Sequence, residues 1–239
     1  MKYEPGAGTV SKPLEGQVVP EGERLRIAEI FTSIQGEGYF TGCLATFIRL
    51  AGCNLQCPFC DTPSKQGELV SSKVLRSELV KRRAEEGKPK HLVLTGGEPT
   101  LQPILSLIEN LGPEWTVQIE TNGTLPDELE KLREHAWITW SPKPIKGWKE
   151  RYQKILDDLA AYVNEVKLLP CLAPELIELI VQSSVTVDQM MHGYGIPLYV
   201  QPIDWPGQGI DWASAFVLLE KYPDKLRLGA QVQKFAQLR

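Results

Sequence analysis

The sequence of 239 residues lacks the features that would mark a membrane, secreted or nucleic-acid-binding protein. No apolar run approaches the roughly 20 residues that a membrane-spanning helix needs. The segment from Met1 to Arg24 has no apolar stretch of the kind found in a secretion signal. Lys and Arg number 26 against 30 Asp and Glu, so the net charge of −4 provides no basic field for nucleic acid. Neither a membrane nor a nucleic acid is therefore expected as a partner.

Cysteine is also scarce, and the five cysteines suggest no framework of pairs. An odd number of this kind favours reduced thiols and a cytoplasmic protein. The Pro- and Gly-containing segment 1–24 predicts a loose N-terminal arm, and residues 25–239 predict one domain. A hydrophobic share of 42% and a charged share of 23% are ordinary for a globular protein with a sizeable core.

Apolar strand-like runs alternate with amphipathic segments from residue 45 onward. The sequence predicts six main strands and a closing one over residues 45–51, 91–95, 116–120, 137–140, 163–169, 196–200 and 226–232. Helices are expected between them, including one over 72–83 and one over 100–112. This alternation predicts an α/β fold with parallel strands and right-handed crossovers. Because six units are too few for a closed eight-stranded barrel, we expect an incomplete (partial) TIM-like barrel, with a doubly wound sheet as the alternative.

Polar and glycine-rich segments follow nearly every predicted strand, at residues 52–53, 96–99, 121–123, 141–143 and 201–204. The carboxyl ends of parallel strands meet at one rim of a barrel or sheet. The turns that lead from helices into strands, such as 112–114, carry no comparable signal. The sequence therefore predicts one shared ligand site at this rim.

Three of the cysteines, Cys53, Cys57 and Cys60, lie within eight residues in a C-x3-C-x2-C pattern. Three thiolates can hold an iron–sulfur cube and leave its fourth iron open, whereas a cluster that only transfers electrons usually has four Cys ligands. Zinc is the alternative, since Cys3His sites are common, but the next histidine, His91, lies 31 residues beyond Cys60. Cys43 and Cys171 are expected to be small packing residues.

The cysteine triplet followed by Thr95-Gly-Gly-Glu-Pro99 resembles the radical S-adenosylmethionine (SAM) superfamily. In that superfamily the open iron chelates the amino and carboxylate groups of SAM, and the Gly-Gly-Glu segment lies along the methionine end. Glycines allow the backbone to approach the cofactor closely, and a carboxylate can accept a hydrogen bond from the methionine ammonium. The pair of motifs is more specific than either motif alone.

Further motifs resemble the 7-carboxy-7-deazaguanine synthase family over roughly residues 25–239. They are Phe31–Gly42 with its Gln-Gly-Glu-Gly segment, Phe47-Ile-Arg49, Cys60-Asp-Thr62, Glu120-Thr-Asn-Gly123, Ser141-Pro-Lys143 and Gln201-Pro202. The resemblance implies a lyase that converts 6-carboxy-5,6,7,8-tetrahydropterin into 7-carboxy-7-deazaguanine and ammonia, in queuosine-type deazapurine biosynthesis. A 5′-deoxyadenosyl radical derived from SAM would remove hydrogen from C6 of the pterin, and SAM would be regenerated.

The resemblance also implies three cofactors, a 4Fe-4S cluster, SAM and Mg2+, and assigns residues to each. Cys53, Cys57 and Cys60 would hold the cluster, and Thr62 would ligate Mg2+, which prefers hard oxygen ligands. The residues that would contact SAM are Phe59, Cys60, Asp61, Gly97, Glu98, Ser141, Pro142, Lys143, Gln201, Pro202, Ile203 and Asp204. The residues that would bind the pterin are Ile34, Gln35, Gly36, Arg49, Thr95 and Arg239, with Glu37 and Glu120 as catalytic acceptors for its guanidine-like nitrogens.

The sequence departs from the family pattern near its end. Relatives often carry a Gln-x-His-Lys segment whose histidine lies near the substrate, but here the segment reads Gln231-Val-Gln-Lys234, and Gln233 cannot titrate. Lys167, which alternates with Glu165, is interpreted as a solvated or paired structural lysine. The resemblance further implies a homodimer and a flavodoxin or ferredoxin as reductant. The alternatives are a radical SAM activase of a glycyl-radical enzyme and a non-catalytic zinc or iron–sulfur module.

Overall fold

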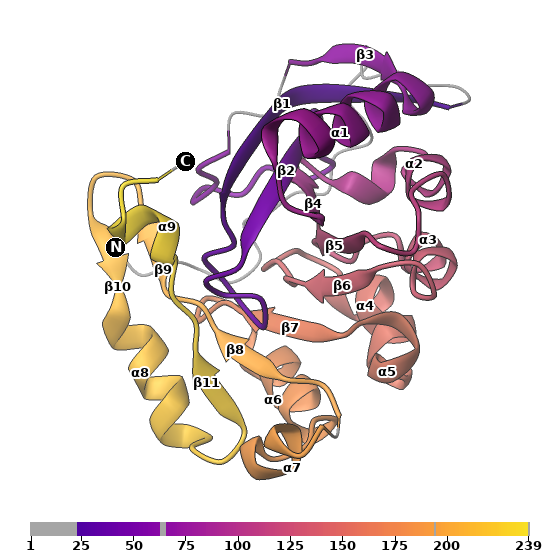
Figure 1. The fold of residues 1–239 in the computed structure, drawn as a ribbon. Coiled ribbons are helices and arrows are strands. Elements are labelled where there is room, and N and C mark those ends of the chain that lie inside the picture. The colour runs from indigo at the N-terminus through magenta and orange to yellow at the C-terminus, as the bar shows by residue number, and fades with distance from the viewer. Residues whose placement is uncertain (1–22, 63–65, 194, 239) are drawn as a thin grey trace.

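The structure is a computed structural model that describes residues 23–62, 66–193 and 195–238 (Figure 1). Its main sheet has nine strands in the order β11-β8-β7-β6-β5-β4-β2-β1-β3. Seven of them are parallel: β2 (Leu44–Leu50), β4 (His91–Gly96), β5 (Thr116–Thr121), β6 (Trp137–Trp140), β7 (Glu165–Leu168), β8 (Leu198–Val200) and β11 (Leu226–Leu228). These are the strands that the sequence predicts.

The parallel strands are added to the sheet in chain order, from β2 at one end to β11 at the other. A doubly wound sheet reverses its strand order at a switch point, and this sheet has no such reversal among its parallel strands. Figure 1 shows a curved sheet with the helices other than α9 on its outer side. β11 and β3 are the two edges, so the barrel is incomplete, and the predicted fold class is confirmed.

The helices are α1 (Ser72–Glu86), α2 (Leu105–Glu109), α3 (Pro126–Leu132), α4 (Trp148–Asp157), α5 (Leu159–Tyr162), α6 (Pro174–Gln182), α7 (Val187–Met191), α8 (Trp212–Lys221) and α9 (Val232–Phe235). The start and end of α1 follow from its caps, because the Ser71 hydroxyl accepts from the Val74 N–H and Gly87 adopts a φ of 63°.

The expected helix over 100–112 is interrupted in the structure. A 3-10 turn, η1 (Pro99–Leu101), precedes α2, and Gln102 between them is extended, with φ −124° and ψ 155°. The physical reason is Pro103, because the residue before a proline is pushed out of the helical region. The side chain of Gln102 then donates to the carbonyl of Ala51 at 2.9 Å, which fixes η1 against the end of β2.

The sequence analysis missed the strands that run against the parallel set. β1 (Arg24–Ile34) pairs antiparallel with β2 and with β3 (Glu68–Ser71), and β9 (Ile203–Trp205) and β10 (Gly209–Asp211) form a hairpin. The apolar residues Leu25, Ile27 and Phe31, separated by two and four positions, were the available sequence signal for β1. Of the predicted arm, residues 1–22 lie outside the described residues, and Arg24 begins β1.

The central parallel strands β4 to β8 are mostly buried on both faces but differ in what each face carries. On one face, Val117 and Ile119 of β5 and Val166 and Leu168 of β7 belong to the hydrophobic core beneath the helices. The alternate residues are polar and point to the inner face, which we call the polar lumen: Gln118, Glu120, Thr139, Glu165 and Lys167. An inner face of this kind can bind a polar ligand but cannot form an apolar barrel core.

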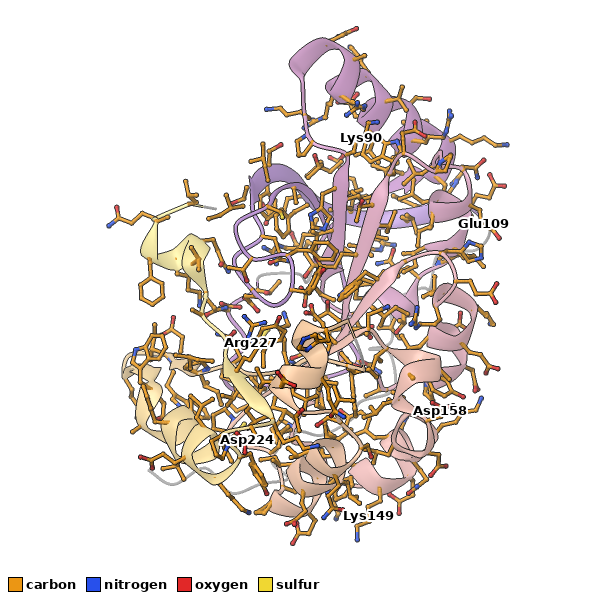
Figure 2. The ribbon with its side chains drawn as sticks, turned by 60° about the horizontal axis from the view of Figure 1, so that its bottom comes forward. Lys90, Glu109, Lys149, Asp158, Asp224 and Arg227 are labelled. Carbon is orange, nitrogen blue, oxygen red and sulfur yellow. The ribbon has the colours of Figure 1, made fainter. Side chains whose placement is uncertain are left out.

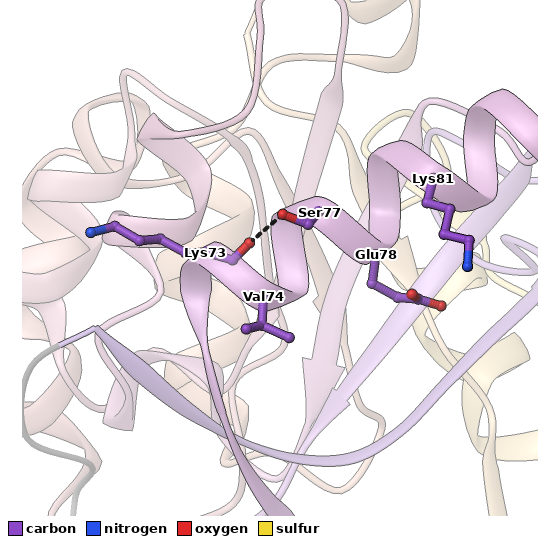
Figure 3. Close-up of a pocket in the computed structure, with 5 residues that line it drawn as sticks. All are labelled: Lys73, Val74, Ser77, Glu78 and Lys81. Carbon is purple, nitrogen blue, oxygen red and sulfur yellow. Dashed lines mark hydrogen bonds between the residues drawn. The ribbon is translucent and has the colours of Figure 1, made fainter.

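The outer surface carries solvated charges. Glu109, Lys149, Asp158 and Asp224 are exposed, and the first three lie near the edge of the molecule in Figure 2. A hollow of about 350 Å3 is lined only by α1 residues, namely Lys73, Val74, Ser77, Glu78 and Lys81, and so has no opposing wall (Figure 3). Within the described residues, no helix is long and apolar enough to span a bilayer.

The two-faced strands generate a stability prediction. Leu168 is fully buried on the core face of β7, so Leu168→Ala is expected to lower the free energy of unfolding by about 2–5 kcal/mol, because it leaves a cavity. The control is Leu228→Ala on the edge strand β11, where Leu228 is 42% exposed and a change within about 0.5 kcal/mol is expected. Urea denaturation measures both, and equal losses would contradict the assignment of faces.

Candidate active site

The predicted cluster ligands lie on one loop, residues 51–62, at the carboxyl end of β2. Cys53 and Cys57 are half-buried and Cys60 is exposed. The Cys60 N–H donates to the Cys57 carbonyl at 3.1 Å, which makes a tight turn between these two residues. Outside this loop, Cys171 packs against the core as expected, whereas Cys43 is exposed, contrary to its predicted packing role.

A buried asparagine that the sequence analysis missed anchors the cysteine loop. Asn54 donates from Nδ2 to the Thr124 hydroxyl at 2.7 Å and accepts at Oδ1 from the Asn122 side chain at 3.1 Å. Both partners lie in the loop after β5. The loop that carries Cys53 is thereby tied to a second loop at the same rim.

The Gly-Gly-Glu segment lies directly against the start of the cysteine loop. The Gly97 N–H donates to the Leu50 carbonyl at 2.9 Å, and the Glu98 N–H donates to the Gly52 carbonyl at 2.8 Å. A Cβ atom on Gly97 would lie 1.7 Å from the Gly52 oxygen, and Gly96 has a φ of 117°. Only glycine fits both positions without moving the backbone.

The carboxylate of Glu98 accepts more hydrogen bonds from within the protein than the sequence indicated. Its carboxylate accepts four hydrogen bonds: from the N–H and hydroxyl of Thr100, from the Thr121 hydroxyl and from the Asn122 N–H. Burial raises its pKa, although these donors favour the ionised form. Three of these donors share Oε1 and one reaches Oε2, so Oε2 keeps an acceptor position, and the expected contact with the SAM ammonium stays a prediction.

The remaining predicted SAM residues lie on the same rim. Lys143 donates from Nζ to the Ser141 hydroxyl at 2.6 Å, and burial raises the pKa of the Cys57 thiol, an effect that the positive charge of Lys143 partly offsets.

The Gln201–Asp204 segment follows β8. The Gln201 N–H donates to the Leu168 carbonyl at 2.7 Å, and Pro202 and Ile203 lead on to Asp204 in β9. Pro142 separates Ser141 from Lys143, and Phe59 of the cysteine loop meets Trp205 edge to face, with ring centroids 5.7 Å apart.

The residues present fit a cluster with three thiolates and a polar cofactor. Among the described residues, no three His, Cys, Asp or Glu side chains converge on a metal position, so the thiols share a loop without being held at ligand distance. Burial raises the pKa of Cys53 to about 12 and also raises the pKa of Cys57. A bound metal would lower the pKa of both thiols, because it binds the thiolate form. The buried Gln201 Oε1 has no hydrogen-bond partner, which leaves an acceptor for a ligand.

Predicted pterin residues from several strands share one level of the sheet. Arg49 of β2 is in register with Glu29 of β1 and with Thr95 of β4. Farther along the sheet, Glu120 is in register with Thr139. Side chains at the same level of neighbouring strands lie close together, so these residues converge.

Arg49 already has protein partners. Its Nε donates to Glu29 at 2.6 Å, and its Nη1 donates to the Thr62 hydroxyl at 3.3 Å. The sequence analysis missed Glu29, which lies in β1 between buried Ile27 and Phe31, two positions from each, next to a register shift between Ile27 and Glu29. Arg49 thus links the predicted Mg2+ ligand to the polar lumen, and its predicted contact with the substrate remains a prediction.

Glu37 and Glu120, which we call the acid pair, meet across the lumen. Lys167, which the sequence analysis left outside the site, pairs with Glu37 Oε2 at 2.8 Å and with Glu120 Oε2. Gln35 donates from Nε2 to Glu120 Oε1 at 3.2 Å. Gln118 also donates to Glu120 Oε1, at 3.1 Å. The structure therefore brings the two predicted acids together around one buried cation.

The two carboxyls of the acid pair differ in their electrostatics. Burial opposes ionisation of Glu37, but the charge of Lys167 and hydrogen bonds from Lys167 and two glutamines outweigh it and lower the pKa to about 2. Burial raises the pKa of Glu120, Lys167 counteracts this, and the charge of Glu37 raises it further. Glu37 is thus a fixed carboxylate, and Glu120 is the more readily protonated member.

The C-terminal segment 231–234 spans the open side of the barrel. Gln231 and Gln233 both donate to Glu37 Oε1, at 2.9 and 3.3 Å, and the Val232 N–H donates to the Gly36 carbonyl at 3.2 Å. Lys234 pairs with Asp61 of the cysteine loop at 2.7 Å and with Asp204 at 3.1 Å.

This segment joins the predicted pterin residues to the predicted SAM residues. On the pterin side, Ile34 ends β1 and Gln35 and Gly36 follow it. A Cβ atom on Gly36 would lie 2.9 Å from the backbone nitrogen of Gln233, so the close approach of the two backbones favours glycine. The predicted contact of Arg239 lies outside the described residues.

Sequence comparisons agree with this geometry. The profile of the radical SAM superfamily matches residues 47–168, about half of the chain. A 7-carboxy-7-deazaguanine synthase of Rickettsia prowazekii is 37% identical over 188 residues, covering 77% of this chain and 75% of that protein. One of Buchnera aphidicola is 30% identical over 233 residues, covering 89% and 98%. One of Hyperthermus butylicus is 50% identical over 127 residues, covering 51% and 53%.

A solved structure agrees as well. The crystal structure of QueE from Escherichia coli has a TM-score of 0.59 and 26% sequence identity, and the match covers 86% of this chain and 93% of that one. The fold, the cysteine loop and the relatives all indicate the same family. The chain therefore belongs to the 7-carboxy-7-deazaguanine synthase family of the radical SAM superfamily.

Proposed function

We propose that this chain converts 6-carboxy-5,6,7,8-tetrahydropterin into 7-carboxy-7-deazaguanine and ammonia, as a step of deazapurine biosynthesis. As a member of its family it is a radical SAM enzyme that uses a 4Fe-4S cluster, SAM and Mg2+. The observation that carries the proposal is the placement of the acid pair in a lumen joined by segment 231–234 to the cysteine loop. The reaction has no net oxidation, so SAM is returned at the end of the cycle.

Cys53, Cys57 and Cys60 would hold the cluster. When bound, the cluster and SAM together supply the radical that removes hydrogen from C6 of the pterin. The backbone at Gly97, the Ser141–Lys143 turn and the unpaired Gln201 Oε1 would orient SAM over the lumen. Their role is to fix the distance and angle between the reacting atoms, which is where a protein contributes most to cofactor chemistry.

The polar lumen would bind both ends of the pterin, the pyrimidine end and the carboxylate end, through different residues. The acid pair would accept from the N–H groups of the pyrimidine end, because carboxylates are strong acceptors for such donors. Arg49 and Thr62 would face the carboxylate end, with Thr62 as a ligand of Mg2+. Segment 231–234 would cover the open side and keep water from the radical.

We further propose that residues 25–239 act as one domain, in a cytoplasmic homodimer that accepts an electron from a flavodoxin or ferredoxin. The family resemblance supports the dimer and the reductant. The unpaired state of Cys43, Cys53, Cys57, Cys60 and Cys171 supports a reducing compartment. Light scattering of the anaerobic holoenzyme tests the dimer directly, and a monomer mass would overturn that part of the proposal.

The central test is anaerobic turnover. Reduced enzyme with SAM, Mg2+ and carboxytetrahydropterin is expected to release ammonia and the deazaguanine acid with no net loss of SAM, because SAM is regenerated. Product and SAM are quantified by liquid chromatography. SAM cleavage without pterin turnover would instead favour another radical SAM activity, such as an activase.

Cys57→Ala is expected to abolish turnover and to lower the iron content after anaerobic reconstitution. The fold should persist, because Cys57 lies on a loop outside the sheet. The matched control is Cys43→Ala, an exposed cysteine outside the cluster motif, which should keep both iron and activity. Iron analysis and circular dichroism measure these outcomes, and full turnover by Cys57→Ala would refute the ligand assignment.

Thr62→Ala is expected to raise the Mg2+ concentration for half-maximal activity by about 10-fold or more, because one hard oxygen ligand is lost. SAM affinity should change less, and Thr62→Ser should restore the Mg2+ response. Activity is titrated against Mg2+ and against SAM separately. Equal losses in both titrations would contradict a metal role for Thr62.

A further inference from the structure

Lys167 lies at the centre of the acid pair, although the resemblance gives it no role. Its neighbours Val166 and Leu168 belong to the core, so the Lys167 side chain points into the polar lumen, where 8% of it is exposed. One ammonium bridges the carboxylates of Glu37, from the loop after β1, and Glu120, from β5. A single cation thus joins two segments that are distant in the sequence.

Burying this lysine is unfavourable unless its charge is compensated. Burial alone would lower the pKa of Lys167, but the charges of Glu120 and Glu37 outweigh burial and raise the pKa above its ordinary value. Lys167 therefore stays protonated and holds its position as a fixed cation. Glu165, on the same strand, accepts instead from the Tyr39 N–H at 2.7 Å and the Thr139 hydroxyl at 2.6 Å.

The other donors to the acid pair differ from Lys167 in kind. In each carboxylate, Oε1 accepts hydrogen bonds from two glutamine side chains, and Oε2 pairs with Lys167. Neutral amide donors can be exchanged for N–H groups of a ligand at little cost, since one neutral donor replaces another. Without Lys167, two buried carboxylates would face each other with no cation between them.

We infer that Lys167 is a positioning residue for substrate recognition: it holds the carboxyl groups of Glu37 and Glu120 side by side, where they accept from the N–H edge of the pterin. The inference rests on the proposed function, because it names what the acid pair recognises. The ion pairs of Lys167 go to Glu37 and Glu120 and not to the cysteine loop, so we expect pterin binding to depend on Lys167 more than SAM binding does. Substrate affinity and SAM affinity should therefore separate when Lys167 is changed.

The experiment uses anaerobically reconstituted holoenzyme with bound SAM, in the wild type and in Lys167→Met. Equilibrium dialysis measures carboxytetrahydropterin binding, and the change that SAM causes in the EPR spectrum of the reduced cluster measures SAM binding. Lys167→Met is expected to weaken pterin binding by at least about 30-fold, because a buried ion-pair partner is lost. SAM affinity should stay within about 3-fold, since a change of that size is about 0.7 kcal/mol.

Two further variants separate positioning from folding. Lys225→Met is the matched control, because Lys225 is a half-buried lysine that donates to the Ser184 carbonyl at 2.6 Å outside the site, and it should bind pterin normally. If Lys167→Met does not fold, the double variant Glu165→Gln/Lys167→Met removes one charge of each sign and leaves the acid pair intact. It too should lose pterin affinity and keep SAM affinity.

The outcomes are distinguishable from failure of the proposed function. A wild type that neither binds nor converts the pterin overturns the proposed function, and the inference with it. An active wild type whose Lys167→Met variant binds the pterin within about 3-fold of normal overturns the inference alone. Parallel loss of pterin and SAM binding, or insolubility of both Lys167 variants, would also overturn it, because either result indicates a structural role.

Discussion

Two backbone hydrogen bonds hold the two halves of the cofactor site together. They run from the N–H groups of Gly97 and Glu98 to the carbonyls of Leu50 and Gly52, and they extend the pairing of β2 and β4 past the ends of both strands. No side chain could stand between these segments, since a Cβ on Gly97 would collide with the Gly52 oxygen. The cysteine loop is thus positioned by the register of the sheet. The buried carboxylate of Glu98 and the amide of Asn54 then fasten the same rim to the loop after β5.

The charge of the lumen imposes a second constraint. Glu37, Glu120 and Glu165 bring three carboxyl groups into a largely buried region, and such groups must be paired, hydrogen-bonded or protonated. Lys167 satisfies two of them, and backbone and hydroxyl donors satisfy the third. The free energy that this arrangement costs is offset by the apolar face of the same strands. Along one strand, the side chains that face the lumen are therefore available for ligand binding, and the alternate side chains that face the helices stabilise the fold.

Local patterns in the sequence were sufficient for the parallel strands and for the rim. Continuous apolar runs located β4, β5 and β6 to within one or two residues, and glycine and polar residues after them marked the ligand side. The antiparallel strand β1 is hard to predict because the alternation that begins at Leu25 is broken by a register shift between Ile27 and Glu29. Lys167 could be read from sequence as an inward charge between Val166 and Leu168. Its partner Glu37 could not, because that contact depends on a loop returning from the far end of β1.

The C-terminal segment shows why residue identity and position must be considered together. Gln233 lies where relatives often have a histidine, and its Nε2 donates to Glu37 while its Oε1 is buried without a partner. A histidine there could gain a proton beside Glu37 and Lys167 and so change the charge of the lumen, whereas an amide supplies a donor and an acceptor at constant charge. The lumen of this chain is therefore insensitive to pH at position 233. Around the acid pair, burial raises the pKa of Glu120, whereas Lys167 lowers that of Glu37, so Glu120 is the member of the pair that gains a proton more readily.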